Sequence, residues 1–544
     1  MPTKKNMDNN WRAVHARRKH DIDSKIPTAW RLPSSLTKGD NVLQVPYESN
    51  ILTPRELRIT EARAVDLVQA LQTGICTSVE VTTAFCKRAA IAHQLTNCLA
   101  VVLFEEALAD AAACDEYMRR HGKPKGPLHG LPISVKEHIY LEGTTATSAL
   151  IAWADDGSPG DALIVKCLRD AGAVFHVKTT NPQCLMSLEC DSNLFGRTTN
   201  PHNRNLTPGG SSGGEGALIA MRGSPLGIGT DIGGSIRAPS AFSGGYGLKP
   251  SVARIPHGGL SGIHGGMENI IGAVGPMANS VDDLKLFCNV VLDANPWDHE
   301  PSLIEIPWRS VSMPEKLKIA VMWHDGVVLP HPPVRRALEE TVKTLKAHGH
   351  TIVNWDPKYH EELFHWANRA YLLDAGREYT DTMDLGSEPP VPSLEWFLSL
   401  AGSSCSIEET WKVNSQRDRL RTQWAVQWRE LGINALLCPA HASVASAHDE
   451  CHYWGYTSVF NSLDLSAAVM PVGTYSPEKY KDAPISLQLV TSRLQEERVL
   501  EVMSAIDAVV NPKAEVFKST APITLSAVEG WKNEGALGAI RTAA

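Results

Sequence analysis

Several features that mark other classes of protein are missing from this 544-residue sequence. Its apolar runs stay well short of the roughly 20 residues that a membrane-spanning helix needs. The first residues, MPTKKNMDNNWRAVHARRKHD, contain no apolar core of a secretory signal. The eleven cysteines are scattered without a C-x-x-C pair, which is typical of reduced thiols. We therefore expect a cytoplasmic protein that has no membrane partner.

An excess of positive charge is also missing. Lys and Arg together number 52 against 60 Asp and Glu, and the net charge of −8 disfavours a nucleic-acid partner. The 20 histidines include no H-E-x-x-H motif or equivalent ligand spacing, so we expect no metal site and no cofactor. With 43% hydrophobic and 21% charged residues, the composition is that of an ordinary globular protein.

Segments with helical and with strand patterns alternate along most of the chain. Thr77 and Glu80 form a capping box for a helix, and residues 131–136 and 226–230 have the short apolar pattern of buried strands. Such alternation predicts an α/β fold, in which helices cover both faces of a sheet. We expect one large α/β/α sandwich around a twisted mixed sheet.

The domain organisation follows from changes in composition. We divide the chain into a polar N-terminal arm over residues 1–55, one main domain over 56–525 and a tail over 526–544. Within the main domain, residues 356–412 lose the regular apolar pattern and are rich in Pro, Trp and Leu. We interpret this segment as an insertion that covers the core.

The most informative segment is the glycine-rich stretch over residues 209–249. It begins GGSSGGEG and continues with GTDIGGSIRAPSAF, so that glycines flank both Ser211 and Ser235. Small residues gather where the backbone must approach a ligand closely or adopt a positive φ. The stretch is therefore either a binding loop or the surroundings of a nucleophilic serine.

Three common glycine motifs do not fit this stretch. A P-loop requires a lysine after its glycines, and Ile232 occupies the place of the third glycine in a dinucleotide fingerprint. A G-x-S-x-G elbow requires a preceding strand, but NRNLTPG precedes Ser211. What remains is Ser235 at a strand-to-helix transition, where successive amides suit an oxyanion. Upstream, Lys136 ends an apolar strand.

These motifs resemble the amidase signature family. GLPISVK, GGSSGGEG, GTDIGGSIRAPSAF and YGLKPS occur here in the family's order, and TEARAVDLVQAL and LPHPPVRRALEETVKTL extend the resemblance over nearly the whole chain. In appearance the sequence is most similar to fungal acetamidases and general amidases. The resemblance implies an enzyme that cleaves a carboxamide to a carboxylic acid and ammonia or an amine through an acyl-enzyme.

The resemblance also assigns the catalytic residues. Ser235 resembles the nucleophile, and Lys136 resembles the general base. Ser211 resembles the serine that bridges them, and its peptide bond with Gly210 is cis in the family. A free lysine has a pKa of ~10.4, so a basic Lys136 requires apolar burial that lowers its pKa.

Supporting roles fall on three further groups of residues. The backbone amides that resemble an oxyanion hole are those of Ile232, Gly233 and Gly234, together with Ser235. The positions that orient the serines in the family are matched by Ser212, Asp231 and Arg237. The acyl pocket of family members is lined at the positions of Met186 and Ser187. For Asp231 and Arg237, a purely structural ion pair is the alternative, and for Met186 core packing.

Three alternative functions stay open. The fold can transfer the acyl group to an amine in a specialised biosynthetic pathway, serve as the glutaminase subunit of a tRNA-dependent amidotransferase, or bind a ligand without catalysis. The acetamidase-like N-terminal half disfavours the glutaminase, and the presence of all three triad residues disfavours the binding protein. The expected partner is a small-molecule amide, with a homodimer as the alternative to a monomer.

Overall fold

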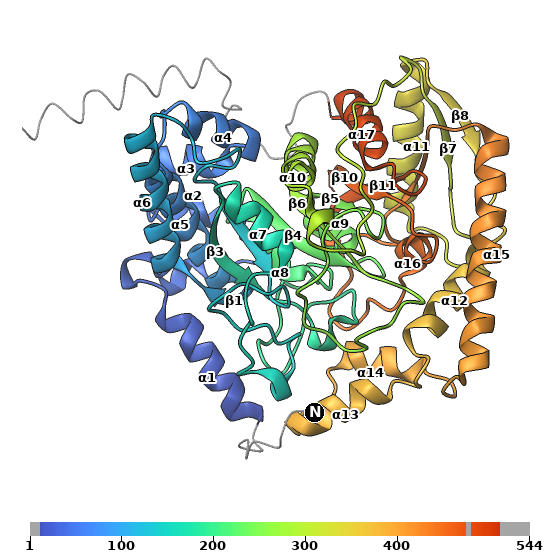
Figure 1. Ribbon diagram of the computed structural model, residues 1–544, viewed down its shortest axis with the longest axis horizontal. Coiled ribbons are helices and arrows are strands. Elements are labelled where there is room, and N and C mark those ends of the chain that lie inside the picture. The colour runs from blue at the N-terminus through green and yellow to red at the C-terminus, as the bar shows by residue number, and fades with distance from the viewer. Residues whose placement is uncertain (1–10, 475–479, 512–544) are drawn as a thin grey trace, which may run out of the picture.

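The computed structural model describes residues 11–474 and 480–511, so the predicted tail over 526–544 lies outside the described residues (Figure 1). Within these ranges eleven strands form one sheet in the order β1-β3-β2-β4-β6-β5-β10-β11-β9-β7-β8. The strands are β1 (Leu99–Val102), β2 (Pro132–Lys136), β3 (Val174–Thr179), β4 (Leu226–Asp231), β5 (Tyr246–Lys249), β6 (Ala273–Ala278), β7 (Lys318–Val321), β8 (Thr351–Asn354), β9 (Ala435–Pro439), β10 (Ala467–Thr474) and β11 (Pro484–Val490).

The sheet is mixed, and its parallel part positions the site. Strand β2 runs parallel to β3 and β4, and β7 runs parallel to β8 and β9. The other six strand pairs are antiparallel. Because β2 and β4 run in the same direction, their last residues, Lys136 and Asp231, reach the same edge of the sheet.

Helices cover both faces of the sheet because its side chains alternate between two apolar cores. In β9, for example, Leu437 packs into one core, whereas Leu436 and Cys438 pack into the other. The first face carries α4 (Ala64–Gln72), α7 (Leu163–Asp170), α10 (Val281–Asp293), α11 (Pro332–Ala347) and α17 (Glu496–Val510). The second carries α8 (Gly213–Ala220), α9 (Arg237–Ser243) and α16 (Gly455–Ser462). The predicted α/β/α sandwich is confirmed.

Short sequence patterns predicted the bounds of several helices and strands correctly. Helix α5 (Ser78–Thr96) begins with the predicted capping box, in which the Glu80 amide donates to Thr77 Oγ1 and the Thr77 amide donates to the Glu80 carboxylate. The strands expected over 131–136 and 226–230 are β2 and β4, each within one residue of the predicted bounds. Helix α6 (Phe104–His121) follows β1 and packs against α5.

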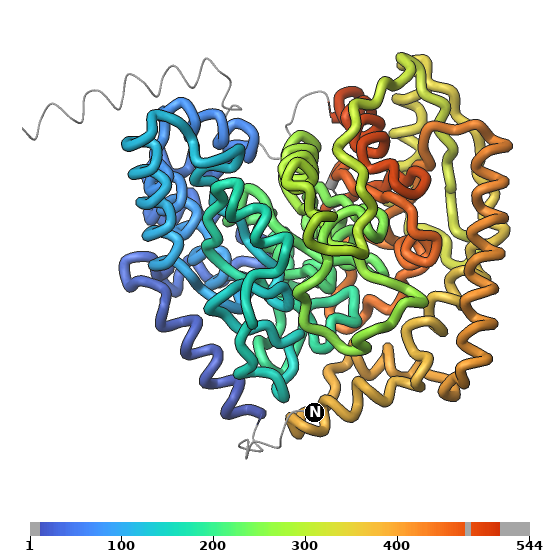
Figure 2. The backbone as a smooth tube through the Cα atoms, in the orientation of Figure 1, coloured from blue at the N-terminus to red at the C-terminus, as the bar shows by residue number. Residues whose placement is uncertain are grey.

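The N-terminal segment packs on the β1 edge of the sheet. It contains α1 (Trp11–Ser24), α2 (Val45–Glu48) and α3 (Pro54–Glu61). Ile22, Ile26 and Val42 are buried in the same apolar cluster as side chains of α5 and α8. In Figure 2 this blue segment runs down the same flank of the molecule as α5 and α6. None of the helices in the described part of the chain is long and apolar enough to cross a membrane.

Residues 356–412 are largely helical, although the sequence showed no regular apolar pattern there. They form α12 (His360–Tyr371), α13 (Arg377–Gly386), α14 (Pro392–Ser399) and the start of α15 (Ile407–Leu431). The first three helices have 12, 10 and 8 residues, and in α12 an apolar pattern is present after all, because Leu363, Trp366, Ala367 and Ala370 are buried at helical spacing. Buried aromatic side chains of this segment, such as Tyr371 and Phe397, share an apolar cluster with Met186 and Leu188.

Candidate active site

Lys136 lies at the centre of the candidate site and is fully buried at the end of β2. In its charged form, its Nζ donates a hydrogen bond to Ser211 Oγ at 2.7 Å and another to Thr230 Oγ1 at 2.9 Å. Ser211 belongs to the loop before α8, and Thr230 is the penultimate residue of β4. The parallel strands thus bring together residues that lie 75 and 94 positions apart in the sequence.

Burial lowers the pKa of Lys136, so that part of the amine is unprotonated at neutral pH. Removal from water lowers the pKa of its amine to about 7, and the negative charge of nearby acidic groups offsets only part of this effect. An exposed lysine with a pKa of ~10.4 is almost entirely protonated at neutral pH. Lys136 is therefore available as a neutral amine in a large fraction of molecules near pH 7.

The backbone around Ser211 leaves no room for larger residues. The Gly210–Ser211 peptide bond is cis, as the resemblance implies, and Gly209 has a φ of +85°. A Cβ on Gly210 would lie 2.1 Å from the carbonyl oxygen of Glu189 and 2.6 Å from that of Ser187. Glycine is therefore required at this position, and the loop holds the Ser211 hydroxyl beside Lys136.

Ser212 joins this loop to the turn that carries Ser235. The Ser212 amide donates to the carbonyl oxygen of Ser235 at 3.0 Å. Its hydroxyl also contacts the backbone of Thr230: Oγ lies 3.3 Å from both the amide nitrogen and the carbonyl oxygen. Ser212 thus holds the two serine-bearing segments at a fixed separation.

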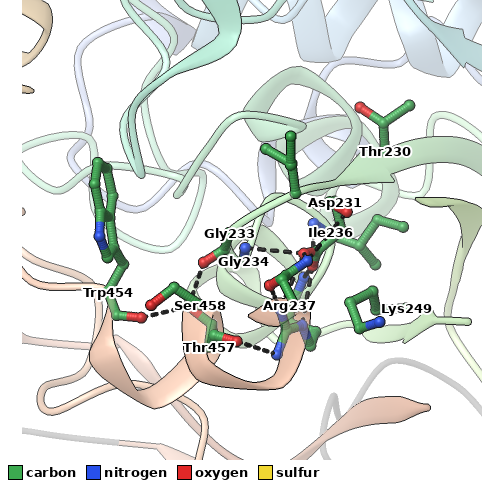
Figure 3. A network of polar contacts seen from close by, with 12 residues as sticks. Thr230, Asp231, Gly233, Gly234, Ile236, Arg237, Lys249, Trp454, Thr457 and Ser458 are labelled. Carbon is green, nitrogen blue, oxygen red and sulfur yellow. Dashed lines mark hydrogen bonds and ion pairs between the residues drawn. The ribbon is translucent and has the colours of Figure 1, made fainter. Parts of the chain in front are cut away.

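Asp231 organises the turn between β4 and α9 (Figure 3). Its carboxylate accepts hydrogen bonds from the amides of Gly234 at 2.9 Å and Ile236 at 3.1 Å. Burial alone would raise the pKa of Asp231, but the charge and hydrogen bonds of Arg237 outweigh burial and hold the pKa far below its usual range. The turn is thus built around a permanent negative charge.

Arg237 is the matching positive charge, and it too is fully buried. Its Nη2 donates to Asp231 Oδ1 at 2.9 Å and its Nε donates to Asp231 Oδ2 at 3.0 Å, so the two residues form a bidentate ion pair. The remaining guanidinium protons are donated to Asn461 Oδ1, Gln488 Oε1 and the carbonyl oxygen of Thr457. Full hydrogen bonding of both partners is what makes a buried ion pair tolerable.

Ser235 lies 5% exposed in this turn, and in the described part of the chain no hydrogen bond links its hydroxyl to Ser211. Among the described residues, no acceptor takes a hydrogen bond from the amides of Ile232, Gly233 or Ser235. The amide of Gly234, which the resemblance also assigns to the oxyanion hole, is instead donated to Asp231. Adjacent amides of this kind form a nest that suits an anionic oxygen.

Two side chains from distant segments fix the direction of these amides. Tyr371, at the end of α12, donates its hydroxyl proton to the carbonyl oxygen of Ile232 at 2.7 Å. Thr457, in α16, donates to the carbonyl oxygen of Gly233 at 2.7 Å, as Figure 3 shows. A Cβ on Gly234 would lie 2.4 Å from Thr457 Oγ1, so this position also requires glycine. No local pattern in the sequence indicates either contact.

The residues predicted to line an acyl pocket lie close to the serine loop. Met186 is 8% exposed and belongs to an apolar cluster with Leu188, Tyr371 and Trp454. The Ser187 hydroxyl accepts a hydrogen bond from the Glu189 amide at 2.9 Å. Met186 therefore belongs to a packed apolar wall, and the Ser187 side chain is engaged with its own backbone.

Taken together, these groups can perform acyl chemistry. A buried amine with a pKa of about 7 can remove a proton from a serine hydroxyl. Converging amides can stabilise the negative charge that develops on a carbonyl oxygen, which is usually the largest single contribution in such reactions. Among the described residues, no group of three or more His, Cys, Asp or Glu side chains is placed to hold a metal ion.

The chain is similar to known amide-cleaving enzymes over most of its length. Residues 80–500 match the family described as Amidase. The chain is 39% identical to an acetamidase of Aspergillus oryzae, over 91% of this chain and 97% of the relative, and 38% identical to an acetamidase of Emericella nidulans, over 92% and 98%. In structure it is similar to a fatty acid amide hydrolase, with a TM-score of 0.89 and 31% identity over 93% of this chain and 98% of the other.

Proposed function

The chain belongs to the amidase family, and we propose that it hydrolyses small or medium carboxamides through a triad of Ser235, Ser211 and Lys136. The observation that carries this proposal is the 2.7 Å contact between Lys136 Nζ and Ser211 Oγ in a fully buried setting. The relatives named as acetamidases support a small acyl group in the substrate.

In the first half of the proposed reaction, Ser235 Oγ attacks the carbonyl carbon of the amide. Its proton passes to Ser211 Oγ, and the Ser211 proton passes to Lys136 Nζ. The amides of Ile232, Gly233 and Ser235 receive the oxyanion of the tetrahedral intermediate. Lys136 then returns a proton through Ser211 to the leaving nitrogen, the C–N bond breaks, and an acyl-enzyme remains.

In the second half, water replaces the amine. Lys136 and Ser211 remove a proton from the water molecule, which attacks the acyl carbon and forms a second tetrahedral intermediate. This intermediate collapses to a carboxylic acid and returns the proton to Ser235. We assign Gly234 a structural part in this scheme, because its amide already binds Asp231 at 2.9 Å.

The choice of substrate depends on the apolar wall beside Ser187. We propose that Met186 limits the length of the acyl group, because it lies in the same apolar cluster as Leu188 and Tyr371. A change of one methylene in such a pocket alters selectivity by about 1–3 kcal/mol. The Ser187 hydroxyl accepts from the Glu189 amide and keeps its own proton available for the substrate.

We also propose that the enzyme works in a reducing compartment such as the cytoplasm. All eleven cysteines lie among the described residues, and none forms a disulfide bond. Ten of them are buried. Burial raises the pKa of several, for example Cys190, and keeps the thiols in their unreactive protonated form.

An ammonia-release screen tests the function. Acetamide, butyramide, hexanamide and benzamide are offered to the wild-type protein, to S235A and to S224A. Ser224 is a matched control, because it is also fully buried but donates its hydroxyl proton to Leu226 at 2.8 Å outside the site. We expect turnover in the wild type and S224A and a loss on the order of 10⁶-fold in S235A.

Two results would contradict the proposal. One is a correctly folded S235A protein with turnover near that of the wild type. The other is release of ammonia only when hydroxylamine is added, with a hydroxamate as the product, because this would indicate acyl transfer to an amine in place of hydrolysis.

A further inference from the structure

A chain of hydrogen bonds leads from Lys136 to a histidine that the proposed reaction does not use. Thr230 Oγ1, which accepts from Lys136 Nζ, also lies 2.9 Å from Nε2 of His138. The other ring nitrogen, Nδ1, lies 2.8 Å from the carbonyl oxygen of Ser261. His138 is 5% exposed and Thr230 is 9% exposed, so the chain is largely shielded from water.

The chemistry of the last group sets the direction of every bond in this chain. The Ser261 carbonyl can only accept, so Nδ1 of His138 carries a proton and donates it. Burial, reinforced by the charge of Lys136, lowers the pKa of His138 to about 3, so that the ring is neutral and Nε2 is an acceptor. The only hydroxyl proton of Thr230 is therefore donated to Nε2, and only lone pairs of Thr230 Oγ1 face Lys136.

We propose that His138 is a positioning residue that directs the lone pair of the neutral Lys136 amine towards Ser211. A neutral amine has two N–H groups and one lone pair. Since Thr230 Oγ1 can only accept, Lys136 must turn an N–H towards it, and the lone pair stays available for the Ser211 proton. Without His138, the Thr230 hydroxyl can rotate and donate to the amine. This inference rests on the proposed role of Lys136 as the base.

The surroundings of His138 hold the acceptor in place. The Ser261 amide donates to the carbonyl oxygen of His138 at 2.9 Å, and the Ser261 hydroxyl lies 2.9 Å from that of Ser148. The charged groups that face His138 are Lys136 and Lys178. The titratable groups that face Lys136 are Cys190, Asp231, Glu215 and Glu137. Substitution of His138 leaves all of these groups in place.

The test compares two variants of His138. His138→Leu removes the acceptor, whereas the side-chain oxygen of His138→Gln can reach the position of Nε2. The readouts are amide turnover and the rate of phosphonylation by a fluorophosphonate, each from about pH 5 to pH 10. We expect H138L to lower the plateau rate by about 10- to 100-fold, which is the loss typical when the partner that orients a metal-ligating side chain is removed. H138Q is expected to recover most of this loss.

The pH profile distinguishes two causes of a lower rate in H138L, namely lost orientation of the Lys136 amine and looser packing around it. In H138L the Thr230 hydroxyl can donate to the neutral amine and stabilise it, so the apparent pKa of the reaction is expected to stay level or fall. Entry of water into a loosened site would favour the charged amine and raise this pKa. A rise in H138L towards the pKa of a free lysine would therefore overturn the inference.

Thr230→Val supplies a second comparison. Because His138 acts only through the Thr230 hydroxyl, the H138L/T230V double variant is expected to react at the rate of T230V alone. Losses that multiply in the double variant would overturn the inference. His202→Leu is the control, because it removes another buried imidazole, which lies 3.1 Å from the carbonyl oxygen of Ser243. It is expected to keep the wild-type pH profile.

Two further comparisons cover the remaining outcomes. If H138L does not fold, H138Q is compared with H138N, whose side chain is too short to reach Thr230, and equal rates would overturn the inference. A Lys136→Met variant distinguishes this inference from the proposed function. If K136M is fully active, the proposed role of Lys136 as the base is wrong. If K136M is inactive but H138L reacts at wild-type rates, only the proposed role of His138 is wrong.

Discussion

The floor and the cover of the site are built in different ways. The floor consists of the ends of β2 and β4 and the loop over residues 209–212, and its charged groups are buried within dense hydrogen bonding. The cover consists of α12 and α16, which reach the floor through the hydroxyls of Tyr371 and Thr457. We propose that the floor carries out the chemistry, and that the cover and its apolar wall select the substrate.

After loss of Ser235 itself, replacement of Lys136 should have the largest effect on activity. Lys136→Met is expected to lower kcat/KM by about 10²- to 10⁴-fold, because proton transfer from Ser211 is lost. Lys178→Met is a matched control, because Lys178 is also buried, with a pKa lowered to about 8, but donates to the Thr145 carbonyl. It is expected to keep most of the activity. Equal losses in both variants would contradict the assignment of the base.

The same variant changes the pH dependence of stability. The pKa of Lys136 is about 7 in the folded protein, against ~10.4 in the unfolded chain, so the unfolded chain binds more protons between these values. Burial of the protonated amine lowers the free energy of unfolding by its full amount below pH ~7, and this destabilisation disappears as the pH rises towards ~10. K136M should therefore be the more stable protein near pH 6 in urea unfolding, and its advantage should shrink steadily up to pH 10.

The charge of Asp231 should matter more than any exposed charge. Asp231→Asn leaves Arg237 buried without a counter-charge, and we expect the free energy of unfolding to fall by about 3–5 kcal/mol. Asp155→Asn removes the partner of Arg17 in an exposed ion pair of similar length, 2.9 Å, and should cost less than about 1 kcal/mol. Urea unfolding of both variants tests this difference. Similar values for the two would contradict the account of the floor.

A change in the apolar wall should alter selectivity without changing the chemistry. Met186→Ala is expected to raise the ratio of kcat/KM for hexanamide over acetamide by about tenfold, while the apparent pKa stays constant. Met503→Ala is the control for lost stability, because Met503 is a fully buried methionine of α17 that packs into the core outside the site. An unchanged ratio of kcat/KM for the two amides in M186A would contradict the proposal that Met186 lines the acyl pocket.

We expect the smallest effect on activity from loss of the Tyr371 hydroxyl in the cover. Tyr371→Phe removes one hydrogen bond to the Ile232 carbonyl, worth about 0.5–1.5 kcal/mol, and should lower kcat by about 3- to 10-fold. Tyr246→Phe removes a hydrogen bond of 2.9 Å to Asp507 outside the site and should leave kcat unchanged. A Y371F protein with wild-type kcat would show that the cover does not hold the amides.

The floor and the cover also differ in how far their features could be predicted from the sequence. Short-range signals were sufficient for α5, whose capping box joins residues three positions apart, and for the strands that place Lys136 and Thr230. The contacts of Tyr371 and Thr457 span 139 and 224 positions, and no local pattern reports such pairing. The helices α12–α14 were not predicted, although Leu363, Trp366, Ala367 and Ala370 are buried in α12 at helical spacing.

The hydrogen bonds among the predicted site residues are visible only in the structure. The sequence singled out Asp231 and Gly234, but only the structure reveals that the Gly234 amide is donated to Asp231. His138 was not among the predicted site residues, because its contact to Thr230 joins residues 92 positions apart. Residue types indicated the chemistry, while the direction of each proton depended on the fold.

The central claim is that Lys136, through Ser211, activates Ser235. The most direct test is the rate of fluorophosphonate labelling between about pH 5 and pH 10, with the labelled peptide identified by mass spectrometry. We predict one labelled residue, Ser235, and a rate that rises to a plateau with an apparent pKa of about 7 in the wild type. In K136M the rate should be at least about 100-fold lower and lack this rise. A flat wild-type profile, or the same profile in K136M, would contradict the claim.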